Sequence, residues 1–115
     1  MDNECPKISE TQTAELVVLD SVTEAGALAD FFKAVGDQTR IRILFLLLAG
    51  TEKCVCDIAR ALEMTVSAVS HQLAILKRCK LVVGRRDGMH ILYRLSDDHV
   101  SVVLKVAVEH IREKE

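Results

Sequence analysis

Four residues near the carboxyl end have the side chains and the spacing of a metal-binding set. Asp97, His99, His110 and Glu113 form the pattern D-x-H-(ten residues)-H-x-x-E. Imidazole nitrogens and carboxylate oxygens are ligands of Zn²⁺, and a closed site with two of each favours that ion. The pattern therefore predicts a zinc site.

One straight helix cannot bring these four side chains to a single ion. On an α-helix His99 and His110 differ by about 20° around the axis but by roughly 16 Å along it, whereas metal–ligand bonds are about 2 Å long. Both ligand pairs share a midpoint near residues 104–105, so two antiparallel copies would bring His99 to the partner's His110. A coiled-coil-like spacing of 4, 3, 4 and 3 relates His99, Val103, Val106, His110 and Glu113. We therefore predict a homodimer with two inter-subunit zinc sites.

A second candidate site lies in the stretch E-K-C-V-C-D, residues 52–57. The thiolates of Cys54 and Cys56 would suit a soft ion such as Cd²⁺ or Pb²⁺. Two ligands do not complete a site, so Cys5 is the candidate third ligand, with Asp57 or Glu4 as the fourth. The alternatives are that the cysteine pair is structural, or that it is a thiol-redox switch.

The elements that must position these residues are mostly helices. Apolar residues recur at helical spacing in residues 24–35, 37–49, 55–62, 65–78 and from 96 to the carboxyl end. We expect Asp37 and Thr65 to cap helices, and Gly36 and Gly50 to end them. Two apolar stripes are predicted: Leu28, Phe31, Phe32 and Val35 in the first helix, and Val100, Val103, Leu104, Ala107 and Ile111 on the core face of the last.

Two features define the expected fold. Only Glu63 and Met64 separate the helical segments 55–62 and 65–78, which is typical of a helix-turn-helix. Residues 81–95 then alternate around Asp87-Gly88, a strong hairpin signal. The chain of 115 residues is thus predicted to be mainly α with a small β-hairpin, a winged helix-turn-helix homodimer. We expect residues 1–20 to be a mobile tail with a weak first helix, and 21–115 to form the DNA-binding and dimerisation domain.

The charge distribution points to nucleic acid. The net charge is −2, yet residues 60–94 carry seven basic residues against two acidic ones. Such a cationic block suits phosphate binding, and short polar side chains on the helix 65–78 suit base edges. The predicted contacts to double-stranded DNA are Ser67, Ser70, His71 and Gln72 on the helix and Arg85 and Arg86 on the wing.

Other classes of protein are disfavoured. The longest apolar run, residues 43–49, is too short to cross a membrane, and no secretory signal is visible. The four cysteines do not resemble a disulfide framework, so we expect a cytoplasmic protein. A zinc hydrolase would need an open water position and a general base, so we predict that the chain is not an enzyme. A metal-independent protein-interaction module remains an alternative.

The chain resembles the ArsR/SmtB family of metal-sensing winged-helix repressors over residues 29–113. The resemblance rests on four motifs: E-K-C-V-C-D-I-A (52–59), S-A-V-S-H-Q-L-A-I-L (67–76), R-R-D-G-M-H-I-L-Y-R-L (85–95) and D-D-H-(ten residues)-H-I-R-E (97–113). It implies a homodimer that binds a palindromic operator when metal-free, releases it when metal binds, and represses genes for metal efflux or sequestration.

The resemblance also indicates which of the two candidate metal sites is the regulatory one. The cadmium- and lead-sensing branch of the family has two amino-terminal cysteines that join the pair in the metal box, whereas this chain has only Cys5 there. Lys53 also replaces the usual leucine. The carboxyl-terminal set with Zn²⁺ is therefore the favoured regulator, with a Cd²⁺/Pb²⁺ sensor or a redox-responsive repressor as the alternatives.

Overall fold

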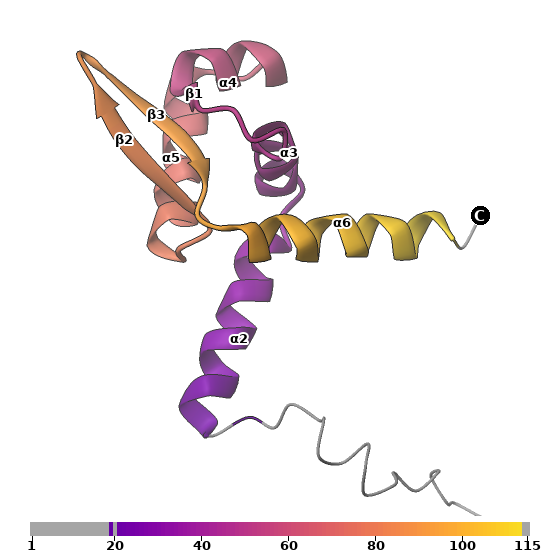
Figure 1. The fold of residues 1–115 in the computed structure, drawn as a ribbon. Helices are drawn as coiled ribbons and strands as arrows, with labels where there is room; N and C mark the ends of the chain where they lie inside the picture. Colours follow the sequence, from indigo (N-terminus) through magenta and orange to yellow (C-terminus); the bar gives the residue numbers. More distant parts are fainter. Residues whose placement is uncertain (1–18, 20, 114–115) are drawn as a thin grey trace, which may run out of the picture.

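The computed structural model describes residue 19 and residues 21–113. The elements in chain order are α2 (Val22–Val35), α3 (Gln38–Leu47), β1 (Lys53–Cys54), α4 (Val55–Leu62), α5 (Val66–Arg78), β2 (Val82–Asp87), β3 (His90–Leu95) and α6 (Asp98–Arg112). A helical body carries a protruding hairpin, and α2 and the far part of α6 extend from it in different directions (Figure 1). The fold is the predicted winged helix-turn-helix, mainly α with a small sheet.

The first two helices begin and end close to the predicted positions. The Ser21 hydroxyl caps α2, and Asp37 Oδ2 accepts the backbone N–H of Arg40 at 3.0 Å to cap α3, as predicted. Gly36 ends α2, also as predicted. The expected end of α3 at Gly50 was wrong, because the regular helix stops at Leu47.

The predicted apolar stripe of α2 does not pack fully within the protomer. Ala34 is the buried residue of this helix, while Leu28 is 45% exposed and Phe32 is 55% exposed. Phe31 and Val35 are half-buried against the core. Because α2 extends away from the body, only one edge of its stripe reaches the other helices (Figure 1).

Helices α4 and α5 form the helix-turn-helix. Glu63 takes a left-handed conformation (φ 56°) directly after α4, which turns the chain sharply. The Thr65 hydroxyl then accepts the backbone N–H of Ala68 at 3.0 Å and caps α5, as predicted. The short connection thus fixes α5 against α4.

The wing is an antiparallel sheet with strand order β1-β3-β2. Asp87 pairs with His90, so the two-residue turn is Gly88-Met89, one residue later than an Asp-Gly turn would be. Gly88 has φ +66°, as the first central position of a type II′ turn requires. The strand β1 was not predicted from the sequence, and it pairs with β3 through Lys53 and Cys54.

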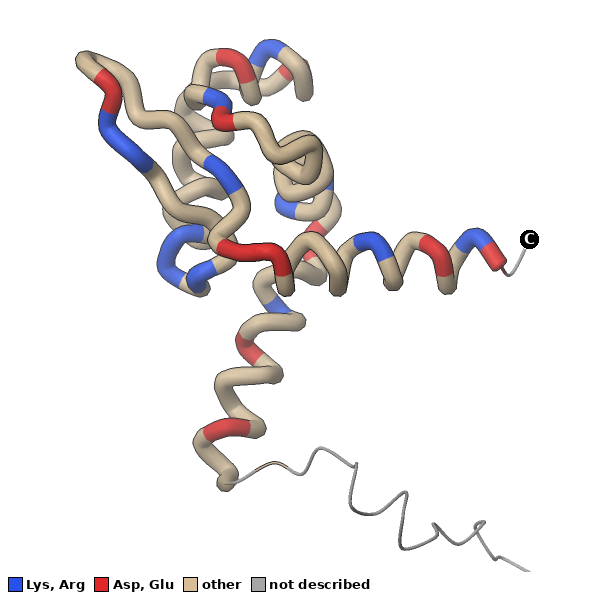
Figure 2. Tube along the Cα trace, in the orientation of Figure 1, with Lys and Arg blue, Asp and Glu red and all other residues tan. Residues whose placement is uncertain are grey.

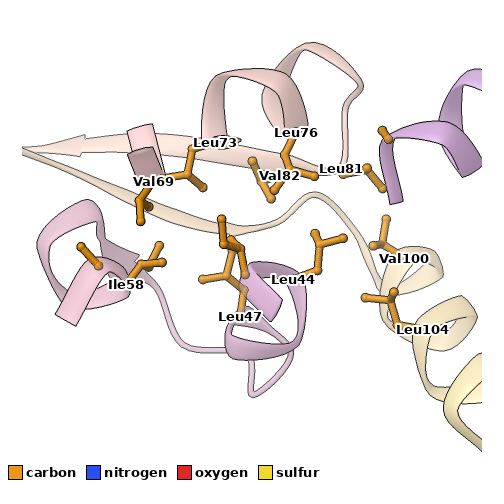
Figure 3. Packing of buried hydrophobic residues seen from close by; sticks show 13 residues of the cluster. Leu44, Leu47, Ile58, Val69, Leu73, Leu76, Leu81, Val82, Val100 and Leu104 are labelled. Atoms are coloured by element: carbon orange, nitrogen blue, oxygen red, sulfur yellow. The ribbon is translucent and has the colours of Figure 1, made fainter. Parts of the chain in front are cut away.

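One aliphatic cluster holds the elements together (Figure 3). Its buried members are Ala34, Ile43, Leu44, Leu47, Ile58, Ala59, Val69, Leu73, Leu76, Leu81, Val82, Val100 and Leu104. Within the described part of the chain no polar or charged residue is buried. None of the described helices is long and apolar enough to cross a membrane.

The buried residues of helix α6 lie in its amino-terminal half. Asp97 Oδ1 accepts the backbone N–H of Val100 at 3.0 Å, and Val100 and Leu104 are buried. The prediction that Ala107 and Ile111 face the core was wrong for the protomer, and Val103, predicted on the same face, is 38% exposed. The reason is that the far part of α6 extends away from the helical body (Figure 1).

Candidate functional site

The exposed face of α5 is polar and then basic. Helical geometry places Ser67, Ser70 and His71 on the side away from the buried Val69 and Leu73, and all three are exposed. The last turn of the helix adds Lys77 and Arg78, which are also exposed. This face therefore offers hydroxyls, an imidazole and two cations to solvent.

Gln72 lies on a different side of α5 from the serines. Its side chain is half-buried, and its Oε1 accepts a hydrogen bond from Arg40 Nη1 at 3.1 Å. Arg40 Nε also donates to the backbone oxygen of Ala34 at 2.7 Å. The guanidinium thus links α2, α3 and α5, and the structure does not bring Gln72 to the exposed face with Ser67 and Ser70.

The two wing arginines have different surroundings. Arg85 donates from Nε to Glu52 Oε2 at 2.9 Å and from Nη2 to Glu52 Oε1 at 2.5 Å. The hydrogen bond and charge of Arg85 lower the pKa of Glu52, against a smaller opposing effect of burial. Arg86 is exposed and takes part in none of the hydrogen bonds or ion pairs found among the described side chains.

Basic residues occur on most elements, and one group of them lies on β2 and around the end of α5 (Figure 2). The start of α6 is acidic, with Asp97 and Asp98. The basic residues from the last turn of α5 to β3 are Lys77, Arg78, Lys80, Arg85, Arg86 and Arg94. A duplex that met the exposed face of α5 would lie in this positive potential.

The carboxyl-terminal metal candidates fall into two pairs at opposite ends of α6. Asp97 Oδ1 lies 3.8 Å from His99 Nδ1, and the His99 side chain is 96% exposed. His110 is in the last turn and Glu113 is the residue that caps the carboxyl end. No cluster of three or more metal-ligating side chains forms among the described residues of one protomer.

These pairs have the donor chemistry of half-sites for a divalent ion. Each offers one imidazole and one carboxylate, and all four residues are exposed. The cap uses only Oδ1 of Asp97, so Oδ2 is outside that hydrogen bond. The donor chemistry therefore suits a zinc ion, which would need ligands from both pairs.

The cysteine candidates lie at the junction of β1 and α4. Cys54 is half-buried at the end of the strand, Cys56 is exposed in the first turn of the helix, and both are free thiols. Asp57 Oδ1 is 3.1 Å from Arg60 Nη1 in an exposed ion pair. The other two candidates, Cys5 and Glu4, lie outside the described residues.

Apolar side chains are exposed on α2 and α6. The large ones are Val22, Leu28, Phe32, Val102, Val103, Val106 and Ile111. Two of them, Val103 and Val106, belong to the predicted pairing seam of α6, and every residue of that seam is exposed. Such surface is typical of an interface between subunits.

Comparison with known proteins identifies relatives of the chain. The family model described as bacterial regulatory protein, arsR family, matches residues 37–83. A transcriptional repressor SmtB homolog of Synechocystis sp. is 41% identical over 95 residues, which is 83% of this chain and 71% of the relative. The cadmium resistance transcriptional regulatory protein CadC homolog of Staphylococcus aureus is 38% identical over 85 residues, 74% of this chain and 70% of the relative.

Solved structures share the fold. The AntR antimony-specific transcriptional repressor superposes with a TM-score of 0.75 at 32% identity, covering 92% of this chain and 96% of that one. A homodimeric winged helix-turn-helix DNA-binding domain from Mycobacterium bovis has a TM-score of 0.71 at 31% identity, covering 84% of this chain and 95% of that one. The similarity thus extends over the DNA-binding helices and the wing.

Proposed function

The chain belongs to the ArsR/SmtB family of metal-responsive winged-helix transcriptional repressors, and from this membership we propose that it binds a palindromic operator as a metal-free homodimer and releases the DNA when Zn²⁺ binds between the subunits. Its relatives are transcriptional regulators, so the chain is a regulator and not an enzyme. The genes under its control would be those for metal efflux or sequestration.

One observation carries the choice of site. The pair Asp97–His99 lies at the start of α6 and the pair His110–Glu113 at its end, and all four residues are exposed on the protomer. Two copies related by a two-fold axis near residues 104–105 would complete each pair with the other. Each subunit would supply two ligands to each of two sites.

The regulatory step follows from the shared helix. Its first turns are fixed to the winged domain through Val100 and Leu104, so a change in how two α6 helices pair moves both domains. The two α5 helices must sit about one DNA turn, roughly 34 Å, apart to enter successive major grooves. A coupling of about 1–3 kcal/mol between the sites would weaken DNA binding about 5–150-fold.

On the DNA side, we propose that α5 enters the major groove. Ser67, Ser70 and His71 would contact base edges or phosphates, and Lys77 would add a phosphate contact at the far end. The exposed polar face of α5 and its basic last turn support this assignment.

The test is DNA binding measured by fluorescence anisotropy while Zn²⁺ is titrated. His110→Ala should keep metal-free DNA binding and lose the zinc response. Glu109→Ala is the matched control, because Glu109 is exposed beside His110 but is outside the predicted set. The site assignment is wrong if His110→Ala still releases DNA on zinc addition, or if the control loses the response equally.

A Cd²⁺ or Pb²⁺ sensor is the second candidate. Two observations favour it: Cys56 is exposed beside Cys54, and one relative is named for cadmium resistance. Cadmium addition should then give an ultraviolet thiolate charge-transfer band and release DNA, and Cys54→Ser should remove both. Cys79→Ser is the control, since Cys79 lies at the far end of α5.

A further inference from the structure

The wing arginine Arg85 is held by an acidic side chain from a distant part of the sequence. Its Nε and Nη2 both donate to the carboxylate of Glu52, at 2.9 and 2.5 Å. The Glu52 side chain is 25% exposed and that of Arg85 is 57% exposed. This is the two-pronged geometry in which a guanidinium binds a carboxylate most strongly.

The pair spans the sheet of the wing. Glu52 directly precedes β1, and Arg85 lies in β2. Between these outer strands runs β3, whose Leu92 is paired with Arg85 on one side and with Cys54 on the other. The ion pair therefore crosses the central strand and fixes the Arg85 side chain over the root of the wing rather than toward its tip.

A carboxylate and a phosphate present the same two-oxygen edge to a guanidinium. Because Glu52 already occupies the Nε–Nη2 edge of Arg85, a DNA phosphate could use that edge only by displacing Glu52. The hydrogen bond from Arg85 and then its charge lower the pKa of Glu52, so the carboxylate is ionised at neutral pH and the competition is with a full negative charge. Arg86, the next residue in β2, has no such competitor among the described side chains.

We propose that Glu52 is a positioning residue that occupies the phosphate-binding edge of Arg85, so that Arg86 and not Arg85 is the wing arginine that contacts DNA phosphate. This inference rests on the proposed function, because it concerns the same DNA-bound state. It also means that the resting wing makes one phosphate contact fewer than its sequence offers. The affinity for DNA is correspondingly lower and easier for an inducer to overcome.

The experiment measures the salt dependence of DNA binding. The full chain is kept metal-free with a chelator and bound to a labelled 30-base-pair duplex of random sequence, because phosphate contacts do not depend on sequence. Salt is varied from about 50 to 200 mM. Each phosphate contact adds about 0.9 to the steepness of log affinity against log salt, so one contact changes affinity by about 3.5-fold over this range.

Four variants separate the outcomes. Glu52→Gln should steepen the slope by about 0.9 and tighten binding at low salt, because it releases Arg85. Arg85→Gln should leave the slope unchanged, whereas Arg86→Gln should reduce it by about 0.9. The double variant Glu52→Gln/Arg85→Gln also loses the acidic charge of Glu52, but it has no Arg85 to release. Its slope should therefore match that of Arg85→Gln.

Two results would overturn the proposal. One is a slope that falls by about 0.9 in Arg85→Gln alone, which would show that Arg85 already contacts DNA. The other is a change in slope on Glu52→Gln that is the same whether or not Arg85 is present. Such a result would show that the change comes from the overall loss of negative charge and not from the release of Arg85. If Glu52→Gln fails to fold, the slope of Arg85→Gln alone still tests whether Arg85 contacts DNA phosphate. Failure of the wild-type chain to bind any duplex at low salt would instead refute the proposed function, and this inference with it.

Discussion

Asp97 has a structural role that can be separated from its proposed role as a metal ligand. Its Oδ1 accepts the backbone N–H of Val100 at 3.0 Å and so caps α6. A serine at this position can make the same capping hydrogen bond but offers no carboxylate to a metal. Asp97→Ser therefore removes one role, and Asp97→Ala removes both.

The expected magnitude follows from the position of the cap. Loss of a side-chain cap costs about 1 kcal/mol, and α6 is attached to the core through Val100 and Leu104, which lie in the first two turns. For a domain of this size that corresponds to a fall of about 4 °C in the midpoint of thermal unfolding. Asp97→Ala should show this fall, whereas Asp97→Ser should stay close to the wild type.

The assay combines two measurements on the same samples. Thermal unfolding is followed by circular dichroism with chelator at one protein concentration, because stability of a dimer depends on concentration. DNA release is followed by anisotropy during zinc titration, and both variants should lose it. Asp98→Ala is the control, since it removes a neighbouring charge but not the cap. Zinc-driven release by Asp97→Ser would refute the ligand assignment, and equal stability of the two variants would refute the capping argument.

Three further predictions concern stability. Leu73→Ala should cost about 2–5 kcal/mol in urea unfolding, because Leu73 is fully buried between α5 and the rest of the core. Arg40→Met should cost about 2 kcal/mol in the same assay, since it removes the charged hydrogen bond to Gln72 and the tie to α2. The lowered pKa of Glu52 means that its bridge to Arg85 stabilises the fold above the ordinary value of 4.5 and is lost as the pH falls through the lowered pKa. The difference in unfolding midpoint between wild type and Glu52→Gln should therefore shrink between pH 5 and pH 3, and a constant difference would contradict this.

The helices and the hairpin could be predicted because their signals are local. A cap such as Asp37 or Thr65 acts on a backbone N–H three residues away, and the Asp-Gly dipeptide marks the hairpin because Gly88 is the first residue of its turn. The strand β1 could not be predicted, because two residues, Lys53 and Cys54, are too few to show a period of two. It is a strand only because β3 supplies the hydrogen-bonding edge beside it.

The surroundings of the candidate DNA-contact residues also depend on residues that are far away in the sequence. Arg85 and Arg86 are adjacent and chemically identical, so the sequence predicts the same DNA contact for both. Their difference comes from Glu52, which is 33 positions away from Arg85 and is brought to it by the register of the sheet. Gln72 is likewise separated from its neighbours on α5 by Arg40, which is 32 positions away. The spacing of residues in the sequence cannot predict these contacts, because they depend on how whole helices and strands pack together.

The far half of α6 leaves apolar side chains exposed. The sequence predicts that Ile111 faces the core of the protomer, but Ile111 is 63% exposed, and Val106, a member of the predicted pairing seam, is 55% exposed. Full burial of such side chains contributes about 1.5–3 kcal/mol each, and this contribution needs no metal. Since the same exposed seam carries His99 and His110, we expect apolar contact to hold the two subunits together before any ion arrives. Metal would then change the geometry of an existing dimer, so sedimentation of the chelated protein should already give the dimer mass.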